Sequence, residues 1–183
     1  DINSEVVIIG GGYTGLLCAI NLIENYNLDV ILLEAGKIGW GASSRNGGFC
    51  SFPPIKTSFK RLQKIYGKEE TKKFFKNAVE GSNYTRDIIS NYNINCEVTG
   101  DSNFSVAQHP SKFKQISEQA KVYKNEFDIE TNIYSKEEFD KIGHDGTEQF
   151  GALSYKPGFG INPLKFVNGI ARHALKKKLK IFE

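Results

Sequence analysis

A glycine-rich turn near the start of the chain constrains the fold more than any other feature. Gly10, Gly12 and Gly15 form the pattern G-x-G-x-x-G directly after the apolar run of residues 5–10, EVVIIG. This run predicts a strand buried on both faces of a parallel sheet. The first glycine permits a tight turn, the second lets backbone approach a pyrophosphate, and the third lets a helix pack close to the strand.

The residues after this turn complete a βαβ unit. Apolar positions return at helical spacing over residues 13–26, Asn27 ends the helix, and residues 29–34 (DVILLE) form a second apolar run. Glu34 lies about twenty residues after Gly15, where the dinucleotide fingerprint has an acid for the ribose hydroxyls. A carboxylate there repels a 2′-phosphate, which argues against NADP. The motif alone leaves FAD and NAD open. A turn that binds nothing is disfavoured because every part of the fingerprint is present.

The rest of the chain has mixed character and then returns to α/β. We expect a loop over 35–54, helices over 58–66, 68–91, 112–126, 136–142 and 163–178, strands over 96–98, 103–108, 129–134, 150–155 and 179–182, and a second loop over 157–163. Parallel βαβ segments therefore flank a middle region of antiparallel α+β character.

Composition excludes several classes of protein. The net charge is +3 over 183 residues and the basic residues are scattered, so nothing indicates nucleic acid or an acidic membrane surface. No apolar stretch approaches the roughly 20 residues of a membrane helix. Cys18, Cys50 and Cys96 are odd in number and widely spaced, which excludes a disulfide framework and a CxxC pair and favours the cytoplasm. We expect Cys18 on the buried face of the first helix. The histidines, His109, His144 and His173, lack metal-ligand spacing, so no metal site is predicted.

Two further stretches carry a family resemblance. Residues 37–49 read KIGWGASSRNGGF and follow the VIIGGGYTG turn, and residues 158–174 read GFGINPLKFVNGIARHA. Together they closely resemble the D-amino-acid oxidase superfamily of FAD-dependent oxidoreductases, particularly its glycine oxidase and γ-glutamylputrescine oxidase-like branch. Members typically carry IGxGASGRNGG after the ribose-binding acid, so Ser44 stands where glycine is usual. Asn162 stands where the γ-glutamylputrescine oxidase-like members often have histidine.

The resemblance implies FAD as the cofactor and assigns its contacts. It puts the glycine turn on the pyrophosphate, Glu34 on the adenosine ribose, and residues 43–48 along the pyrophosphate and beside the isoalloxazine. Arg45 would neutralise phosphate or stabilise a reduced flavin. The candidate cofactor-binding residues are Gly10, Gly12, Tyr13, Thr14, Gly15, Glu34, Ala35, Ser43, Ser44, Arg45, Asn46, Gly47 and Gly48.

The expected fold class is α/β, a Rossmann-like FAD-binding βαβ domain with an inserted, incomplete α+β portion of a substrate domain. The expected divisions are the βαβ unit and flavin loop at 1–56, a helical segment at 57–93, the partial substrate domain at 94–156, and a return to the FAD-binding domain at 157–183. Because the chain starts at a strand without Met and ends in a core strand, we expect a piece of a longer enzyme. Alone, this piece should bind FAD poorly or not at all and should show no oxidase activity.

The resemblance implies the oxidation of an amine or amino acid to an imine, with oxygen as electron acceptor. The partner is then a small-molecule amine or amino acid. Two alternatives remain open: a flavin dehydrogenase that uses a quinone or carrier protein, and an inert structural fragment without cofactor. No residue is assigned a catalytic role, and the oligomeric state is not predicted.

Overall fold

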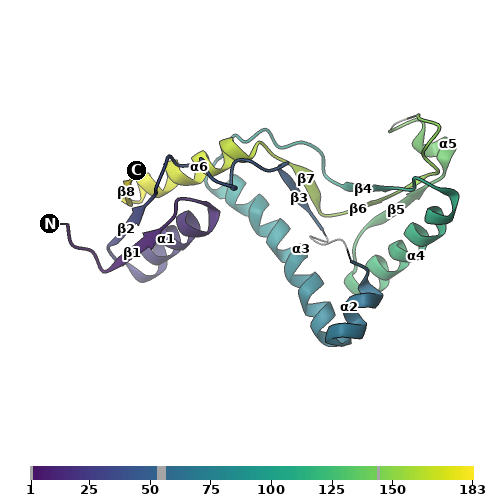
Figure 1. Cartoon of the computed structure of the whole chain (residues 1–183), viewed down its shortest axis with the longest axis horizontal. Helices are drawn as coiled ribbons and strands as arrows, with labels where there is room; N and C mark the ends of the chain where they lie inside the picture. The colour runs from purple at the N-terminus through teal and green to yellow at the C-terminus, as the bar shows by residue number, and fades with distance from the viewer. Residues whose placement is uncertain (1, 53–56, 144) are drawn as a thin grey trace. The chain divides into compact units, whose positions relative to one another are not determined.

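The computed structural model describes residues 2–52, 57–143 and 145–183. The elements in chain order are β1 (Val6–Ile9), α1 (Tyr13–Tyr26), β2 (Val30–Leu33), β3 (Phe49–Ser51), α2 (Phe59–Tyr66), α3 (Lys68–Asn91), β4 (Asn103–Val106), α4 (Pro110–Phe127), β5 (Thr131–Tyr134), α5 (Lys136–Phe139), β6 (Ala152–Tyr155), β7 (Gly158–Gly160), α6 (Pro163–Lys176) and β8 (Lys180–Phe182) (Figure 1). They form two compact units.

The first unit contains Asp1–Phe49, Arg86–Thr99 and Gly160–Glu183. Its sheet has the order β1-β2-β8 and is parallel throughout, with Val6 opposite Val30 and Leu32 opposite Ile181. The predicted βαβ unit is therefore confirmed. Helix α1 begins and ends where its periodicity predicts, and Asn27 ends it in the left-handed conformation.

One face of this sheet carries the core of the first unit. Leu16 and Ile20 of α1 and Val167 and Ile170 of α6 pack with Leu32, and all five are at most 1% exposed. The side chains of Val6, Ile8 and Ile181 join them from the same face of the sheet. Helices α1 and α6 thus cover a single face.

Two expectations about burial in the first unit were wrong. Val7 and Ile9 of β1 are 55% and 87% exposed, so burial of this strand on both faces was wrong. No helix in the described part of the chain covers them. Cys18 is also exposed, not buried. Successive residues of a helix are turned by about 100°, so the Cys18 side chain points away from that of Leu16, two positions earlier. Leu16, Ala19 and Ile20 form the buried stripe of α1.

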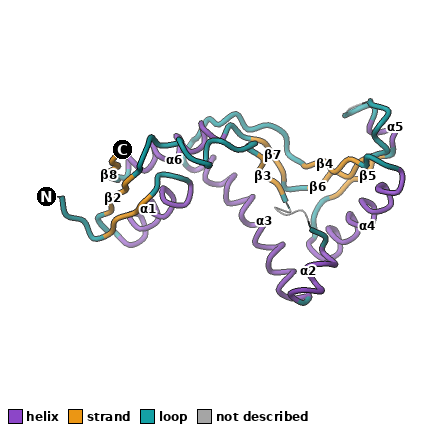
Figure 2. The backbone as a smooth tube through the Cα atoms, viewed as in Figure 1, coloured by secondary structure: helices purple, strands orange, loops and turns teal. Residues whose placement is uncertain are grey.

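The second unit contains Cys50–Thr85 and Gly100–Phe159. Its antiparallel sheet has the order β4-β6-β5 (Figure 2). Side chains from α3, α4 and this sheet form a second core rich in aromatic rings, in which Phe52 packs edge-on against Phe75 and Tyr123 at centroid distances of 5.5 and 5.2 Å. Such edge-to-face pairs add specific geometry to ordinary apolar burial.

Two short strands lie within the segments expected to be loops. Strand β3 lies within 35–54 and β7 within 157–163, and the two pair with each other. The strand expected over 96–98 is absent, and an isolated bridge joins Thr99 to Gly160 instead. Helix α4 begins at Pro110, which occupies its first turn, where proline is tolerated. Within the described ranges, no helix has both the length and the apolar character needed to cross a membrane.

Candidate cofactor site

The glycine turn joins the carboxyl end of β1 to the start of α1. Gly10 has φ of 103°, a conformation that side chains rarely adopt, and its N–H donates to the Leu33 carbonyl at 2.8 Å. A Cβ on Gly15 would overlap the Gly10 carbonyl oxygen. The third glycine of the motif therefore lets helix and strand approach one another closely.

The N-terminus of α1 presents backbone N–H donors. Gly12 is the N-cap, and no side chain of its own caps the helix. The N–H of Tyr13 donates to Ser43 Oγ at 3.1 Å, while the N–H groups of Gly12 and Thr14 have no acceptor among the residues that the structure describes. These donors and the positive end of the helix dipole fit a pyrophosphate.

Glu34 follows β2 and turns its carboxylate toward the glycine turn. Oε2 accepts the N–H of Gly11 at 2.7 Å, and Oε1 accepts the N–H of Gly36 at 2.9 Å. The bond from Gly11, followed by that from Gly36, lowers the pKa of the Glu34 carboxyl, so it is charged at neutral pH. Each carboxylate oxygen has a further lone pair that can accept a ribose hydroxyl. Ala35, the next candidate residue, is exposed.

The loop over residues 43–48 starts beside the helix N-terminus and is held by its own hydrogen bonds. Ser44 Oγ donates to the Gly39 carbonyl, and Asn46 Oδ1 accepts the N–H of Gly48 at 2.8 Å. Gly48 has φ of 68°, and a Cβ there would overlap the Ile161 carbonyl oxygen. Packing therefore requires glycine at position 48, a reason the motif alone did not reveal.

Arg45 lies on the ring of Trp40. Its guanidinium carbon is 4.2 Å from the ring centroid, within cation–π distance, and both side chains are exposed. The guanidinium charge of Arg45 therefore lies at the surface of the loop, where it can bind an anion.

A cavity of about 600 Å³ borders the same loop. Ser44, Asn46, Gly47 and Phe49 line one side, and the residues before α6, including Asn162, line the other together with Glu97 and Thr99. Phe49 is 81% exposed. Sequence reasoning missed both residues: Phe49 ends the stretch over residues 37–49 but was assigned no role, and Glu97 belongs to no motif.

Glu97 is held in an unusual backbone conformation at this cavity. Its φ is 57°, and its carboxylate pairs with Lys165 and accepts a hydrogen bond from Asn162 Nδ2 at 2.9 Å. The bond from Lys165, followed by that from Asn162, lowers the pKa of the Glu97 carboxyl. Asn162 also caps α6, since its Oδ1 accepts the N–H of Lys165 at 3.1 Å.

The two histidines that the structure describes, His109 and His173, have separate surroundings. His173 stacks on Tyr92 at 3.7 Å between ring centroids and lies 3.4 Å from Glu24, and His109 caps α4. His144 lies outside the described residues. Over the described ranges, no three His, Cys, Asp or Glu side chains are grouped as metal ligands would be.

A parallel βαβ unit with a glycine turn, an open helix N-terminus and an acid after the second strand defines the class of dinucleotide-binding proteins. Within that class, the chain belongs to the FAD dependent oxidoreductase family, DAO, whose model matches residues 5–183. The family is FAD-dependent, and the residues at the glycine turn fit the pyrophosphate and ribose of that cofactor.

Known proteins agree with the family and the fold. The γ-glutamylputrescine oxidoreductase of Escherichia coli is 35% identical over 122 residues, which are 64% of this chain and 27% of that protein. L-Amino acid deaminase from Proteus myxofaciens has a TM-score of 0.73 at 22% identity, over 98% of this chain and 38% of that one. Glycine oxidase from Bacillus cereus has a TM-score of 0.71 at 15% identity, over 99% and 46%. The chain thus spans less than half the length of each of these proteins.

Proposed function

We propose that this chain binds FAD for an enzyme that oxidises an amine or amino acid to an imine. The observation that carries the proposal is the pair of hydrogen bonds that holds the Glu34 carboxylate against Gly11 and Gly36, beside the open N-terminus of α1. The names of the relatives, a γ-glutamylputrescine oxidoreductase and a glycine oxidase among them, support the substrate class.

Each part of the site has a proposed role. The N–H groups at the start of α1 bind the pyrophosphate, Glu34 binds the adenosine ribose, and the loop over residues 43–48 contacts the flavin half. Arg45 supplies positive charge to a phosphate or to the flavin ring. In this proposal the first unit is the FAD-binding domain, and the second unit is part of an inserted substrate domain.

When bound, FAD supplies the acceptor for a hydride equivalent from the C–H bond beside a neutral amine. The residues of this chain bind and orient the cofactor, and none of them has to move a proton for that step. The imine product hydrolyses in water to a carbonyl compound and an amine or ammonia. We propose oxygen as the electron acceptor and a cytoplasmic location, because three widely spaced cysteines do not form a disulfide framework.

The test is anaerobic mixing of the full-length protein with a panel of primary and secondary amines and amino acids. We expect at least one compound to bleach the flavin absorbance, and oxygen to restore the absorbance with formation of peroxide. Restoration by a quinone but not by oxygen would instead indicate a dehydrogenase. A full-length protein that retains no flavin, or flavin that no amine or amino acid bleaches, would contradict the proposal.

A further inference from the structure

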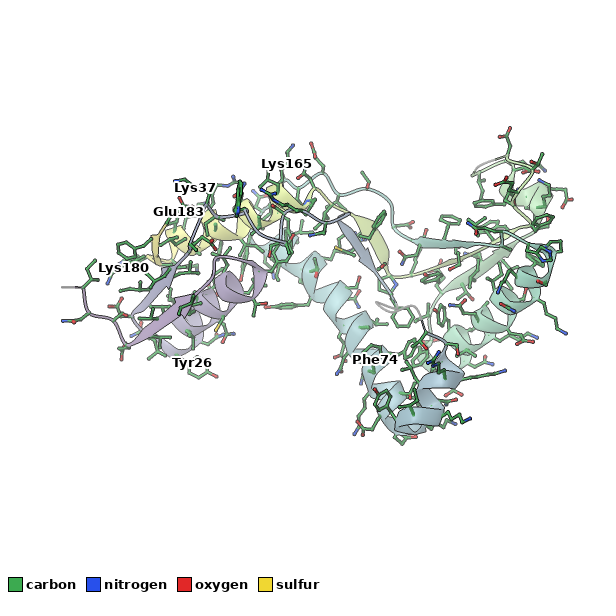
Figure 3. The ribbon with its side chains drawn as sticks, viewed as in Figure 1. Tyr26, Lys37, Phe74, Lys165, Lys180 and Glu183 are labelled. Atoms are coloured by element: carbon green, nitrogen blue, oxygen red, sulfur yellow. The ribbon has the colours of Figure 1, made fainter. Side chains whose placement is uncertain are left out.

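The residue after β8 reaches back to the loop that follows β2. Glu183 Oε1 accepts the N–H of Ile38 at 2.8 Å, and Oε2 pairs with Lys37 Nζ at 3.1 Å. Figure 3 shows the labelled side chains of Lys37 and Glu183 next to each other. The Lys37 side chain is 80% exposed, so solvent screens the ion pair strongly. The bond to the Ile38 backbone is therefore the contact that fixes the loop.

The anchored loop in turn packs against the glycine turn. The Ile38 Cδ1 atom fills the space beside Gly11, where a Cβ on that glycine would overlap it. Gly11 is buried, and its N–H is the donor to Glu34 Oε2. The Ile38 side chain thus lies beside the hydrogen bond between the Gly11 N–H and the Glu34 carboxylate.

The end of β8 also contacts Glu34 directly. The Glu34 N–H donates to the Phe182 carbonyl at 2.8 Å, which places Glu183 one residue beyond the backbone that pairs with Glu34. Glu183, Ile38, Gly11 and Glu34 form a continuous set of contacts within the first unit. Neither the glycine motif nor the loop over residues 43–48 includes Glu183.

We propose that Glu183 is a positioning residue for cofactor binding: it holds Ile38 against Gly11 and so fixes the Glu34 carboxylate that receives the adenosine ribose. This inference rests on the proposed role of Glu34. Through Glu34, Glu183 affects the binding of only the adenosine part of the cofactor. Glu183 itself does not touch the cofactor.

The test is titration of flavin-stripped full-length protein with FAD and, as competitor, with ADP, which carries the adenosine and two phosphates but no flavin. We expect Glu183→Ala to lower the affinity for both FAD and ADP by about five- to tenfold. This is the usual effect of losing one hydrogen bond that orients a charged group. Glu183→Gln keeps an acceptor for the Ile38 N–H and should restore affinity to within about twofold of the wild type. Lys37→Met, which removes only the ion pair, should also stay within about twofold.

A double-mutant cycle separates positioning from an independent structural effect. In a Glu34→Ala background, Glu183→Ala should cause no further loss of FAD affinity. Additive losses, or wild-type affinity in Glu183→Ala, would overturn the inference while the ribose assignment stands. Wild-type affinity in Glu34→Ala alone would overturn the ribose assignment itself.

A second variant covers the case in which Glu183→Ala does not fold. Ile38→Ala empties the space beside Gly11 but leaves the backbone N–H for Glu183. It should weaken FAD and ADP to a similar extent, again without additivity to Glu34→Ala. Unchanged affinity in Ile38→Ala would overturn the inference by itself.

Discussion

The Glu34 carboxylate accepts two backbone N–H groups, and these bonds lower its pKa in the folded protein below the ordinary value of 4.5. A lowered folded-state pKa gives stability that is complete above the ordinary value and is lost as the pH falls through the folded-state value. We expect Glu34→Gln to lower the free energy of unfolding at pH 6–7. The difference from the wild type should shrink as the pH falls from the ordinary value of 4.5 through the lower folded-state value, because the wild-type carboxyl then takes up a proton.

Urea unfolding across this pH range measures the effect. Glu69→Gln, in the exposed first turn of α3, is the control for the change from glutamate to glutamine itself. A constant difference between Glu34→Gln and the wild type from pH 7 to pH 3 would mean that the charge of Glu34 is not what these bonds stabilise.

Gly15 and Gly81 are both helical glycines, and the space around them differs. A Cβ on Gly15 would overlap the Gly10 carbonyl, whereas a Cβ on Gly81, inside α3, has nothing within 4 Å. Gly15→Ala should therefore lower the free energy of unfolding by about 1–3 kcal/mol through overpacking. Gly81→Ala should raise it by about 0.5–1 kcal/mol, since alanine is the better helix former. Denaturant titration distinguishes the two, and equal effects would contradict the close approach of α1 to β1.

At the scale of elements, Asn162 determines where α6 begins. Its Oδ1 accepts the N–H of Lys165, and its Nδ2 donates to Glu97. We expect Asn162→Ala to lower the free energy of unfolding by about 1 kcal/mol, the usual contribution of an N-cap. Asn162→Ser keeps a capping oxygen and should recover most of this loss. If thermal unfolding shows the same loss for serine and alanine, the bond to Glu97 and not the cap is what Asn162 contributes.

The elements that sequence reasoning predicted well are those with a strong periodic or punctuation signal. Helices α1 and α3 match their expected ranges because apolar spacing defines their length, and Asn27 ends α1 as expected. Strands β3 and β7 were missed because FCS and GFG are short and lack β-branched runs. Their pairing is a long-range property that no local pattern encodes.

The same distinction holds for the site. The glycines and Glu34 follow from a motif with a known physical basis, whereas the hydrogen bond from the Gly11 N–H to the Glu34 carboxylate is seen only in the structure. The contacts of Gly48 with Ile161, of Glu97 with Lys165 and of Glu183 with Ile38 join residues far apart in the sequence. Only the tertiary fold brings these partners together.

At the scale of the whole molecule, an apolar face of the parallel sheet is exposed. Val7, Ile9, Leu33 and Phe182 share this face by register, and each is more than 40% exposed. We expect the 183-residue chain to self-associate through it, because contiguous apolar surface of this kind favours burial against another chain. Val7→Thr/Ile9→Thr should shift sedimentation velocity profiles toward monomer.

The control for this prediction is Tyr26→Thr, which removes an exposed aromatic ring at the end of α1, outside that face. It should leave the association unchanged. If the double variant and the control sediment alike, this face of the sheet does not mediate association.

Flavin content after substitution of Gly12 tests the assignment of FAD to the glycine turn most directly. A Cβ at Gly12 would lie 2.8 Å from Ser43 Oγ, so Gly12→Val is compared with Gly12→Val/Ser43→Gly, in which that contact is relieved. Gly41→Val, at a glycine with nothing within 4 Å, is the control. The measurement is the flavin absorbance of purified full-length protein, with chromatographic identification of the released cofactor. We expect FAD in the wild type and Gly41→Val, and none in either Gly12 variant, because valine projects into the pyrophosphate site. Wild-type FAD content in folded Gly12→Val would contradict the assignment.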